Sequence, residues 1–152
     1  IIANFGPLWC RQDPMQAISS APRIGPERTD RQYLIRSLLD NKTRVAFGSD
    51  WPVTSEIPLE GIAVPVHRQT PDRKPEGGWM PEQAITIQEA FQAYTHEVAY
   101  QAFEDKSWGT LAAGFNADFI ILDKNPFEID PHDVPAINVV KTYRNGEAIY
   151  SK

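Results

Sequence analysis

Asp50 is the residue of this chain whose neighbours best fit it for chemistry, because it follows an apolar run where that run must stop. A carboxylate in such a place can ligate a metal ion and carry a proton. Residues 45–47 read Val-Ala-Phe, a run typical of a strand buried on both faces. Pro52 cannot donate a ladder hydrogen bond and disfavours helix at Trp51, so the chain must leave the sheet just after the carboxylate. The sequence therefore predicts an acidic residue at the carboxyl end of a buried strand, which is where the catalytic residues of βα barrels lie.

A second interpretation of Asp50 needs no chemistry, because aspartate also favours turns and caps for local reasons. The same choice applies to Asn4 and Trp9, which follow or end a short apolar run at the start of the chain. They can line a substrate cavity, or they can be a strand-end amide and an aromatic ring packed under a loop. Trp51 is expected to be a further aromatic residue of the pocket. None of the three histidines is predicted to be a ligand. His67 is expected to be a solvated residue at a helix end, His96 a surface residue and His132 a turn residue.

The elements that must position these residues follow one another as strand, loop, helix and strand. Residues 1–5 can form a short strand that stops at Gly-Pro, and residues 11–27 are rich in Asp, Ser, Pro and Gly, which predicts a long loop with at most one helical turn. Thr29 or Asp30 can cap a helix that runs to about residue 40. The order predicts a βα unit, with its two strands parallel and joined by a right-handed crossover.

The second half of the chain carries a long helix and then short strands. Residues 58–69 share an apolar helical face, with Pro58 suited to the first position and Pro65 expected to break or kink the interior. Thr86 and Glu89 have the spacing of a capping box that opens a helix predicted over residues 86–103. Residues 119–122, 139–143 and 148–150 are β runs, and Asn-Gly at 145–146 predicts a tight hairpin between the last two.

Composition excludes some classes of partner. The net charge of −5 over 152 residues provides no basic patch for nucleic acid or an anionic membrane. Cys10 is the single cysteine, so no internal disulfide can form, and we expect a reducing cytoplasm. Its simplest role is that of a small apolar residue. The chain starts within an apolar run, without an initiator Met, which we expect of a piece of a larger protein.

Several separated strings, in the right order, resemble the YtcJ-like branch of the amidohydrolase superfamily (amidohydrolase family 3). They are Phe-Gly-Ser-Asp-Trp-Pro at 47–52, Ala-Asn-Phe-Gly-Pro-Leu-Trp at 3–9, Arg-Gln at 68–69 with Gly-Gly-Trp-Met-Pro-Glu-Gln at 77–83, and the Gly-x-Leu-x-x-Gly-x-x-Ala-Asp pattern at 109–118. The family usually has Gln where this chain has Gly6. In that family, the residue matching Asp50 ligates the catalytic metal and moves a proton from the metal-bound water to the leaving group.

The resemblance implies an α/β fold: the last two βα units of a metal-dependent-hydrolase (β/α)8 barrel over residues 1–106, and strands of an adjoining β-sandwich over residues 107–152. It implies a hydrolase of C–N bonds other than peptide bonds, acting on a small amide, formamide or cyclic amide, with zinc or another divalent metal in the complete enzyme. The family's other ligands are expected upstream of Ile1, so we expect this chain alone to bind no metal tightly and to be inactive.

The alternative is a non-catalytic regulatory or interaction module derived from an amidohydrolase. Open strand edges and an uncovered apolar face further predict that the chain pairs with something, most simply as a homodimer.

Overall fold

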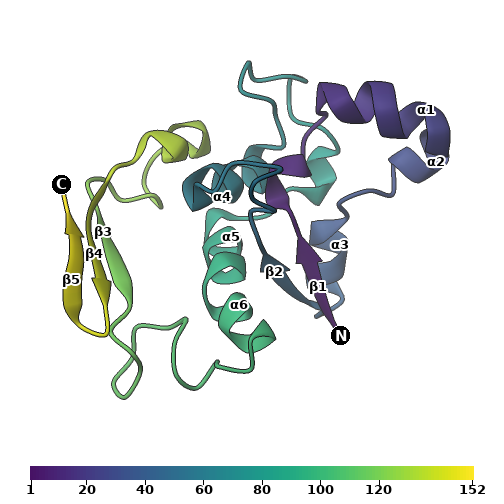
Figure 1. The fold of residues 1–152 in the computed structure, drawn as a ribbon. Helices are drawn as coiled ribbons and strands as arrows, with labels where there is room; N and C mark the ends of the chain where they lie inside the picture. The colour runs from purple at the N-terminus through teal and green to yellow at the C-terminus, as the bar shows by residue number, and fades with distance from the viewer.

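The computed structural model describes residues 1–152 as an α/β fold with two small sheets (Figure 1). The first sheet is the parallel pair β1 (Ile2–Phe5) and β2 (Arg44–Phe47), in the register Ala3 to Val45 and Phe5 to Phe47. Val45 and Phe47 are buried, as the apolar run predicts. The parallel pairing of the two predicted strands is confirmed.

The connection from β1 to β2 is more helical than the sequence predicts. The helix η1 (Pro7–Trp9) is followed by a π-helical turn (Gln16–Ser20), α1 (Ala21–Ile24) and α2 (Pro26–Thr29). The prediction of a loop with at most one helical turn over residues 11–27 was wrong. Prolines in the first turns of α1 and α2 explain the difference, because proline is preorganised for a helix start although it breaks a helix interior.

The helix before β2 also begins later than predicted. It is α3 (Ile35–Asp40), and Thr29 ends α2 with its hydroxyl donating to the Gly25 carbonyl at 2.8 Å. Tyr33 has a φ of 53°, which no helix accommodates. The cap predicted at Thr29 or Asp30 is therefore wrong, and α3 is a short helix whose buried Ile35 reaches the core.

The helices after β2 pack between the two sheets (Figure 1). They are α4 (Pro58–His67), α5 (Ile87–Tyr94) and α6 (His96–Gln101), with the single turn η3 (Pro81–Gln83) before α5. Pro58 opens α4 as predicted. The helix continues for two residues past Pro65, so Pro65 does not break it at that position. The capping box at the start of α5 is present in both directions, with Glu89 N donating to Thr86 Oγ1 at 3.2 Å and Thr86 N donating to Glu89 Oε2 at 2.8 Å.

The single helix predicted over residues 86–103 is in fact two helices. Thr95, at φ −119° and ψ −87°, separates α5 from α6. The break turns α6 toward β2, so that Arg44 donates to Glu97 at 2.9 Å and lies over the Tyr100 ring, 3.7 Å from its centroid. The tertiary ion pair therefore prevails over the continuous helical spacing of the sequence.

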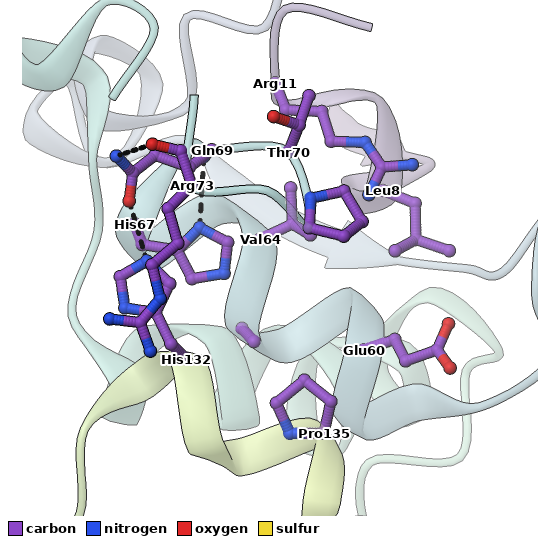
Figure 2. A pocket seen from close by; sticks show the side chains of 12 residues that line it. Leu8, Arg11, Glu60, Val64, His67, Gln69, Thr70, Arg73, His132 and Pro135 are labelled. Carbon is purple, nitrogen blue, oxygen red and sulfur yellow. Dashed lines mark hydrogen bonds between the residues drawn. The ribbon is translucent and has the colours of Figure 1, made fainter. Parts of the chain in front are cut away.

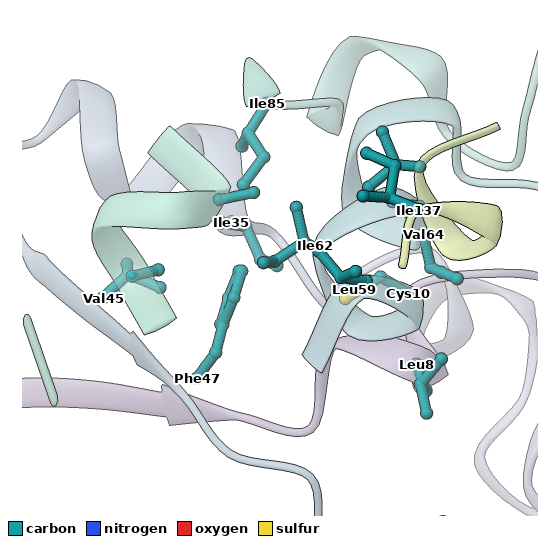
Figure 3. Packing of buried hydrophobic residues seen from close by; sticks show 14 residues of the cluster. Leu8, Cys10, Ile35, Val45, Phe47, Leu59, Ile62, Val64, Ile85 and Ile137 are labelled. Carbon is teal, nitrogen blue, oxygen red and sulfur yellow. The ribbon is translucent and has the colours of Figure 1, made fainter. Parts of the chain in front are cut away.

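The apolar core lies between the first sheet and its helices, and α4 runs through it (Figure 3). Its buried members are Leu8, Cys10, Ile35, Val45, Phe47, Leu59, Ile62, Ala63, Val64, Ile85, Ala90, Ala93, Val134 and Ile137. Val134 and Ile137 come from the segment around η4 (Pro131–Ala136), which packs against α4. Side chains from the C-terminal third of the chain therefore pack in the same core as the rest.

One arginine is fully buried beside this core. Arg68 ends α4 in a left-handed conformation, with φ 52°. Its Nε donates to the Trp79 carbonyl at 2.6 Å and its Nη1 to the Tyr33 carbonyl at 3.2 Å, and the Trp79 amide donates back to the Arg68 carbonyl at 2.8 Å. Arg68 thus holds three separate loops together.

The second sheet is antiparallel, in the order β3 (Phe119–Leu122), β4 (Val139–Arg144), β5 (Glu147–Ser151). The predicted hairpin is confirmed, since Asn145 and Gly146 have φ of 50° and 80°, the sign that a type I′ turn requires. Asp118 Oδ1 accepts from the Asn145 amide at 2.7 Å and holds the hairpin tip. None of the helices has the length and apolar character needed to cross a membrane.

Candidate functional site

Asp50 lies in a turn that begins where β2 stops. The Gly48 amide donates to the Phe5 carbonyl at 3.0 Å, so the parallel pairing continues one residue past β2. Asp50 follows after one further residue, with an exposed carboxylate and φ 58°. The carboxylate predicted to follow the apolar run thus comes three residues after Phe47, the last residue of β2.

Backbone hydrogen bonds fix the turn that carries Asp50. The Val53 amide donates to the Asp50 carbonyl at 2.8 Å, and the Thr54 hydroxyl donates to the Ser49 carbonyl. Trp51 is 66% exposed, and its amide donates to Ser49 Oγ at 3.3 Å. Hydrogen bonds before and after Asp50 therefore hold its left-handed backbone in place. Its carboxylate makes no hydrogen bond within the chain and can bind another group.

The other predicted site residues, Asn4 and Trp9, lie beside this turn. Asn4 is exposed on β1; its Nδ2 donates to Gln101 Oε1 at 2.9 Å, and its Oδ1 lies 4.0 Å from where a Cβ on Gly48 would be. A Cβ on Gly6 would lie 3.1 Å from Trp9 Cδ1 and 3.9 Å from Asp50 Cβ. Position 6 therefore touches both the tryptophan and the aspartate, and glycine leaves that space open.

The donor set for a metal ion is incomplete in these residues. No group of three or more His, Cys, Asp and Glu side chains is arranged to hold a metal. Catalytic zinc sites use three protein ligands and an open position, so Asp50 fits the part of one ligand and the chain does not fit a whole centre. No catalytic step can be derived through a metal from these residues alone.

A polar cavity of about 400 Å³ lies where α4 meets the η4 segment (Figure 2). Its charged and polar side chains are Arg11, Glu60, His67, Gln69, Thr70, Arg73 and His132, and its apolar side chains include Leu8, Ala63 and Val64. A smaller hollow of about 330 Å³ shares Leu8, Arg11 and Glu60 with it and is lined by Trp9, Val53 and Thr54 next to the Asp50 turn.

The two histidines of the cavity stack on each other, with ring centroids 4.3 Å apart and planes 8° from parallel. His132 Nδ1 lies 2.8 Å from Asp130 Oδ1, and His132 Nε2 lies 2.7 Å from Gln69 Oε1. The Gln69 amide nitrogen donates to the carbonyls of Arg73 and Pro75, at 3.0 and 2.8 Å, which fixes its oxygen toward His132. Both nitrogens of His132 thus face side-chain oxygen atoms, and these two contacts fix the orientation of the ring.

His67 is the neutral partner of this stack. Its Nδ1 accepts from the Gln69 amide at 3.0 Å. Burial, and next the charge of His132, lower the pKa of His67 to about 4. Sequence reasoning treated His67 as a solvated helix end and His132 as a turn residue; both interpretations missed the contact, because the residues lie on elements far apart in the chain.

Cys10 and His96 take the simpler roles expected of them. Cys10 is fully buried in the core, and burial raises the pKa of its thiol to about 12. His96 is a half-exposed residue whose Nδ1 lies 3.1 Å from Glu97 Oε1. Neither residue takes part in a candidate site.

The model of the amidohydrolase family matches residues 7–150. Among curated proteins, the chain is 38% identical over 151 residues to Protein LONG AFTER FAR-RED 3 of Arabidopsis thaliana, covering 99% of this chain and 25% of that protein. It is 31% identical to the Putative amidohydrolase YtcJ of Bacillus subtilis (86% of this chain, 25% of that protein). It is 30% identical to the N-substituted formamide deformylase of Arthrobacter pascens (79% of this chain, 22% of that protein). The chain thus spans about a quarter of the length of these relatives.

Solved structures have the same fold over most of the chain. A Xaa-Pro dipeptidase with bound methionine in the active site aligns with a TM-score of 0.60 at 22% identity, covering 90% of this chain and 28% of that one. An amidohydrolase from Thermotoga maritima aligns with a TM-score of 0.55 at 18% identity, covering 79% and 26%. With the family model matching nearly all residues, this chain belongs to the amidohydrolase family.

Proposed function

We propose that this chain is the C-terminal portion of a metal-dependent hydrolase that acts on C–N bonds other than peptide bonds, in a small amide, formamide or cyclic amide. The observation that carries the proposal is the family match over residues 7–150, with the free carboxylate of Asp50 three residues after the end of β2, a strand of the parallel pair. The similarity to an N-substituted formamide deformylase supports the choice of bond.

In this proposal β1 and β2 are the last two strands of a (β/α)8 barrel, residues 1–106 belong to that barrel, and residues 107–152 supply strands to a β-sandwich beside it. The parallel register of β1 and β2 and the separate antiparallel sheet β3–β5 support this division. Asp50 then lies at the barrel end where barrel enzymes carry their active sites.

Asp50 supplies one carboxylate ligand and carries a proton toward the leaving nitrogen, while Asn4, Trp9 and Trp51 line the substrate cavity. A zinc or similar divalent ion would polarise the carbonyl and activate a water. Because the remaining ligands are proposed to come from residues outside this chain, the 152-residue chain alone is inactive and binds no metal tightly.

The test uses the whole protein of which this chain is a part. We expect Asp50→Asn to lower kcat/KM on N-substituted formamides or cyclic amides by about 10²- to 10⁴-fold, the usual contribution of a proton-transfer group, and to lower metal content. The matched control is Asp30→Asn, at another exposed aspartate, and it should leave both unchanged. Full activity and metal content in Asp50→Asn would refute the role of Asp50, and stoichiometric zinc in the isolated chain after chelator dialysis would refute the incomplete-centre proposal.

The alternative proposal is a non-catalytic regulatory or interaction module derived from an amidohydrolase. The same assay separates the two, because a module would show no turnover that depends on Asp50.

We also propose that the isolated chain forms a homodimer through a strand edge or an uncovered apolar face. β1 and β2 each pair on one side only, and Leu111 and Ile149 are exposed. Sedimentation at micromolar concentrations should give twice the monomer mass; a compact monomer throughout that range would contradict this proposal.

A further inference from the structure

The cavity between α4 and the η4 segment has hydrogen-bond donors that the protein itself does not satisfy. Arg11 Nε is buried without a hydrogen-bond partner, and the Arg11 guanidinium makes only a long contact of 3.5 Å from Nη2 to Asp13. Because Nε has no accessible surface, a ligand in the cavity can reach this guanidinium only through its terminal nitrogens, of which Nη1 has no hydrogen-bond partner in the protein.

Arg73 brings a second guanidinium to the same cavity, on an exposed side chain. It enters the hydrogen-bond network of the fold through its backbone only, its carbonyl accepting from Gln69 Nε2 and its amide donating to the Thr70 carbonyl. Figure 2 shows its guanidinium beside the His67 and His132 rings. It forms no ion pair, the Asp130 carboxylate is near enough for the two charges to interact, and its exposed position lets it meet a ligand as well.

His67 adds a neutral donor. Because its Nδ1 accepts from the Gln69 amide, the proton of the neutral ring is on Nε2, which has no partner in the protein. His132 is stacked on it and is held between Asp130 and Gln69. This end of the cavity therefore presents donors from several elements and is built to receive an acceptor.

The remaining lining residues of the cavity determine which class of anion fits it. Leu8, Ala63 and Val64 give the cavity an apolar surface, and Glu60 is the one carboxylate among its lining residues. In Figure 2 Glu60 lies on the opposite side of the cavity from the His67 and His132 pair. A ligand with one negative charge at the histidine end and an apolar body satisfies both ends, whereas a doubly charged phosphate would be repelled by Glu60.

We propose that this cavity is a binding site for a small monocarboxylate, whose carboxylate is held by Arg11, Arg73 and the Nε2–H of His67. A planar carboxylate matches the forked donors of a guanidinium, and such charge-assisted hydrogen bonds are about twice as strong as neutral ones. Asp50 does not line this cavity and takes no part in the binding. The volume of about 400 Å³ is in the usual range for small-molecule sites.

The test is an NMR titration of the 152-residue chain at constant ionic strength with butyrate, inorganic phosphate and n-butylammonium. We expect butyrate to shift the Arg11 Nε–H and Gln69 amide signals saturably, with a millimolar Kd, and to bind more tightly than phosphate. Butylammonium should cause no such shift. An ammonium group is itself a donor, so the donors at the histidine end cannot bind it, and the positive charges of the arginines repel it.

Three variants test which charged residues affect the Kd for butyrate. Arg73→Gln, at an exposed residue, should keep the fold and raise the Kd for butyrate about tenfold, or about 1.4 kcal/mol. Glu60→Gln should lower that Kd, because it removes the repulsive charge. Arg31→Gln, at an arginine that pairs with Glu27 away from the cavity, is the matched control and should leave the Kd unchanged.

The proposal is overturned if butyrate gives no saturable shift up to about 50 mM, a range that includes any site of millimolar Kd. It is also overturned if phosphate binds as tightly as butyrate, or if Arg31→Gln weakens binding as much as Arg73→Gln.

Discussion

Acidification from pH 7 to pH 5 should destabilise this protein through His67. The ring is stacked on His132, which faces acceptors at both nitrogens, and its own Nδ1 already accepts a hydrogen bond. A proton added to His67 must go to Nδ1, so it would break that bond and place a positive charge 4.3 Å from the His132 ring. The folded state therefore resists protonation, which the unfolded chain accepts freely.

The magnitude follows from the two pKa values. Burial, followed by the charge of His132, lowers the pKa of His67 to about 4 from its ordinary value of 6.5. Between these values the unfolded state binds more protons than the folded state, so stability falls as pH falls. At pH 5 the difference reaches about 2 kcal/mol as an upper bound, at 1.36 kcal/mol per pH unit below 6.5. Because solvent at the cavity rim screens the ring, we expect about 1 kcal/mol.

The assay is urea unfolding at pH 7 and pH 5, compared with the variant His67→Asn. Asparagine keeps an acceptor near the position of Nδ1 but does not titrate, so the variant should lose about 1 kcal/mol less than the natural protein on acidification. In thermal unfolding, this difference corresponds to about 2–4 °C for a chain of this size. The window ends at pH 5 so that most carboxyl groups remain ionised.

A matched control separates His67 from histidines in general. His96→Asn removes a half-exposed histidine outside the stack, and this variant should keep the full pH dependence of the natural protein. Two results would contradict the role of His67. One is an equal loss of unfolding free energy between pH 7 and pH 5 in His67→Asn and the natural protein; the other is a pH dependence of stability that disappears in His96→Asn.

Further substitutions test the packing, each by the free energy of urea unfolding at pH 7. Thr86→Ala removes the capping box of α5 and should cost about 1 kcal/mol, whereas Thr86→Ser should cost little. Gly61→Ala places a methyl group against the Tyr94 hydroxyl and should cost about 1–3 kcal/mol; the double variant with Tyr94→Phe should recover part of that loss. Glu97→Gln leaves Arg44 without its charged partner and should cost about 1–3 kcal/mol, and an unchanged stability would show that this pair does not hold α6 on β2.

Sequence predicted the parts of the fold that depend on neighbouring residues. The capping box of α5, the hairpin turn at Asn145 and Gly146, and the strand that ends before Asp50 each need only a few consecutive side chains and their backbone preferences. The parallel pairing of β1 and β2 followed from the order of elements, because a helical connection between two strands of one sheet returns the chain in the same direction.

Sequence could not predict the features that depend on tertiary contacts. The helical spacing of residues 86–103 continues through Thr95, whereas the observed turn of α6 goes with tertiary contacts of Arg44 to Glu97 and Tyr100. The stack of His67 and His132 joins residues far apart in the chain, so neither residue carries a local signal for it. The donors of the cavity are likewise recognisable only after α4 and the η4 segment have come together.

The buried guanidinium of Arg68 restricts how relatives of this protein can diverge. Most interior positions can exchange one aliphatic residue for another, but an arginine keeps its charge at all physiological pH values and needs its carbonyl partners in place. Lysine has no planar fork with which to reach the carbonyls of Tyr33 and Trp79 together. A lineage that loses Arg68 must therefore rebuild both loops at once, and we expect insertions and deletions in these loops to accompany every replacement of the arginine.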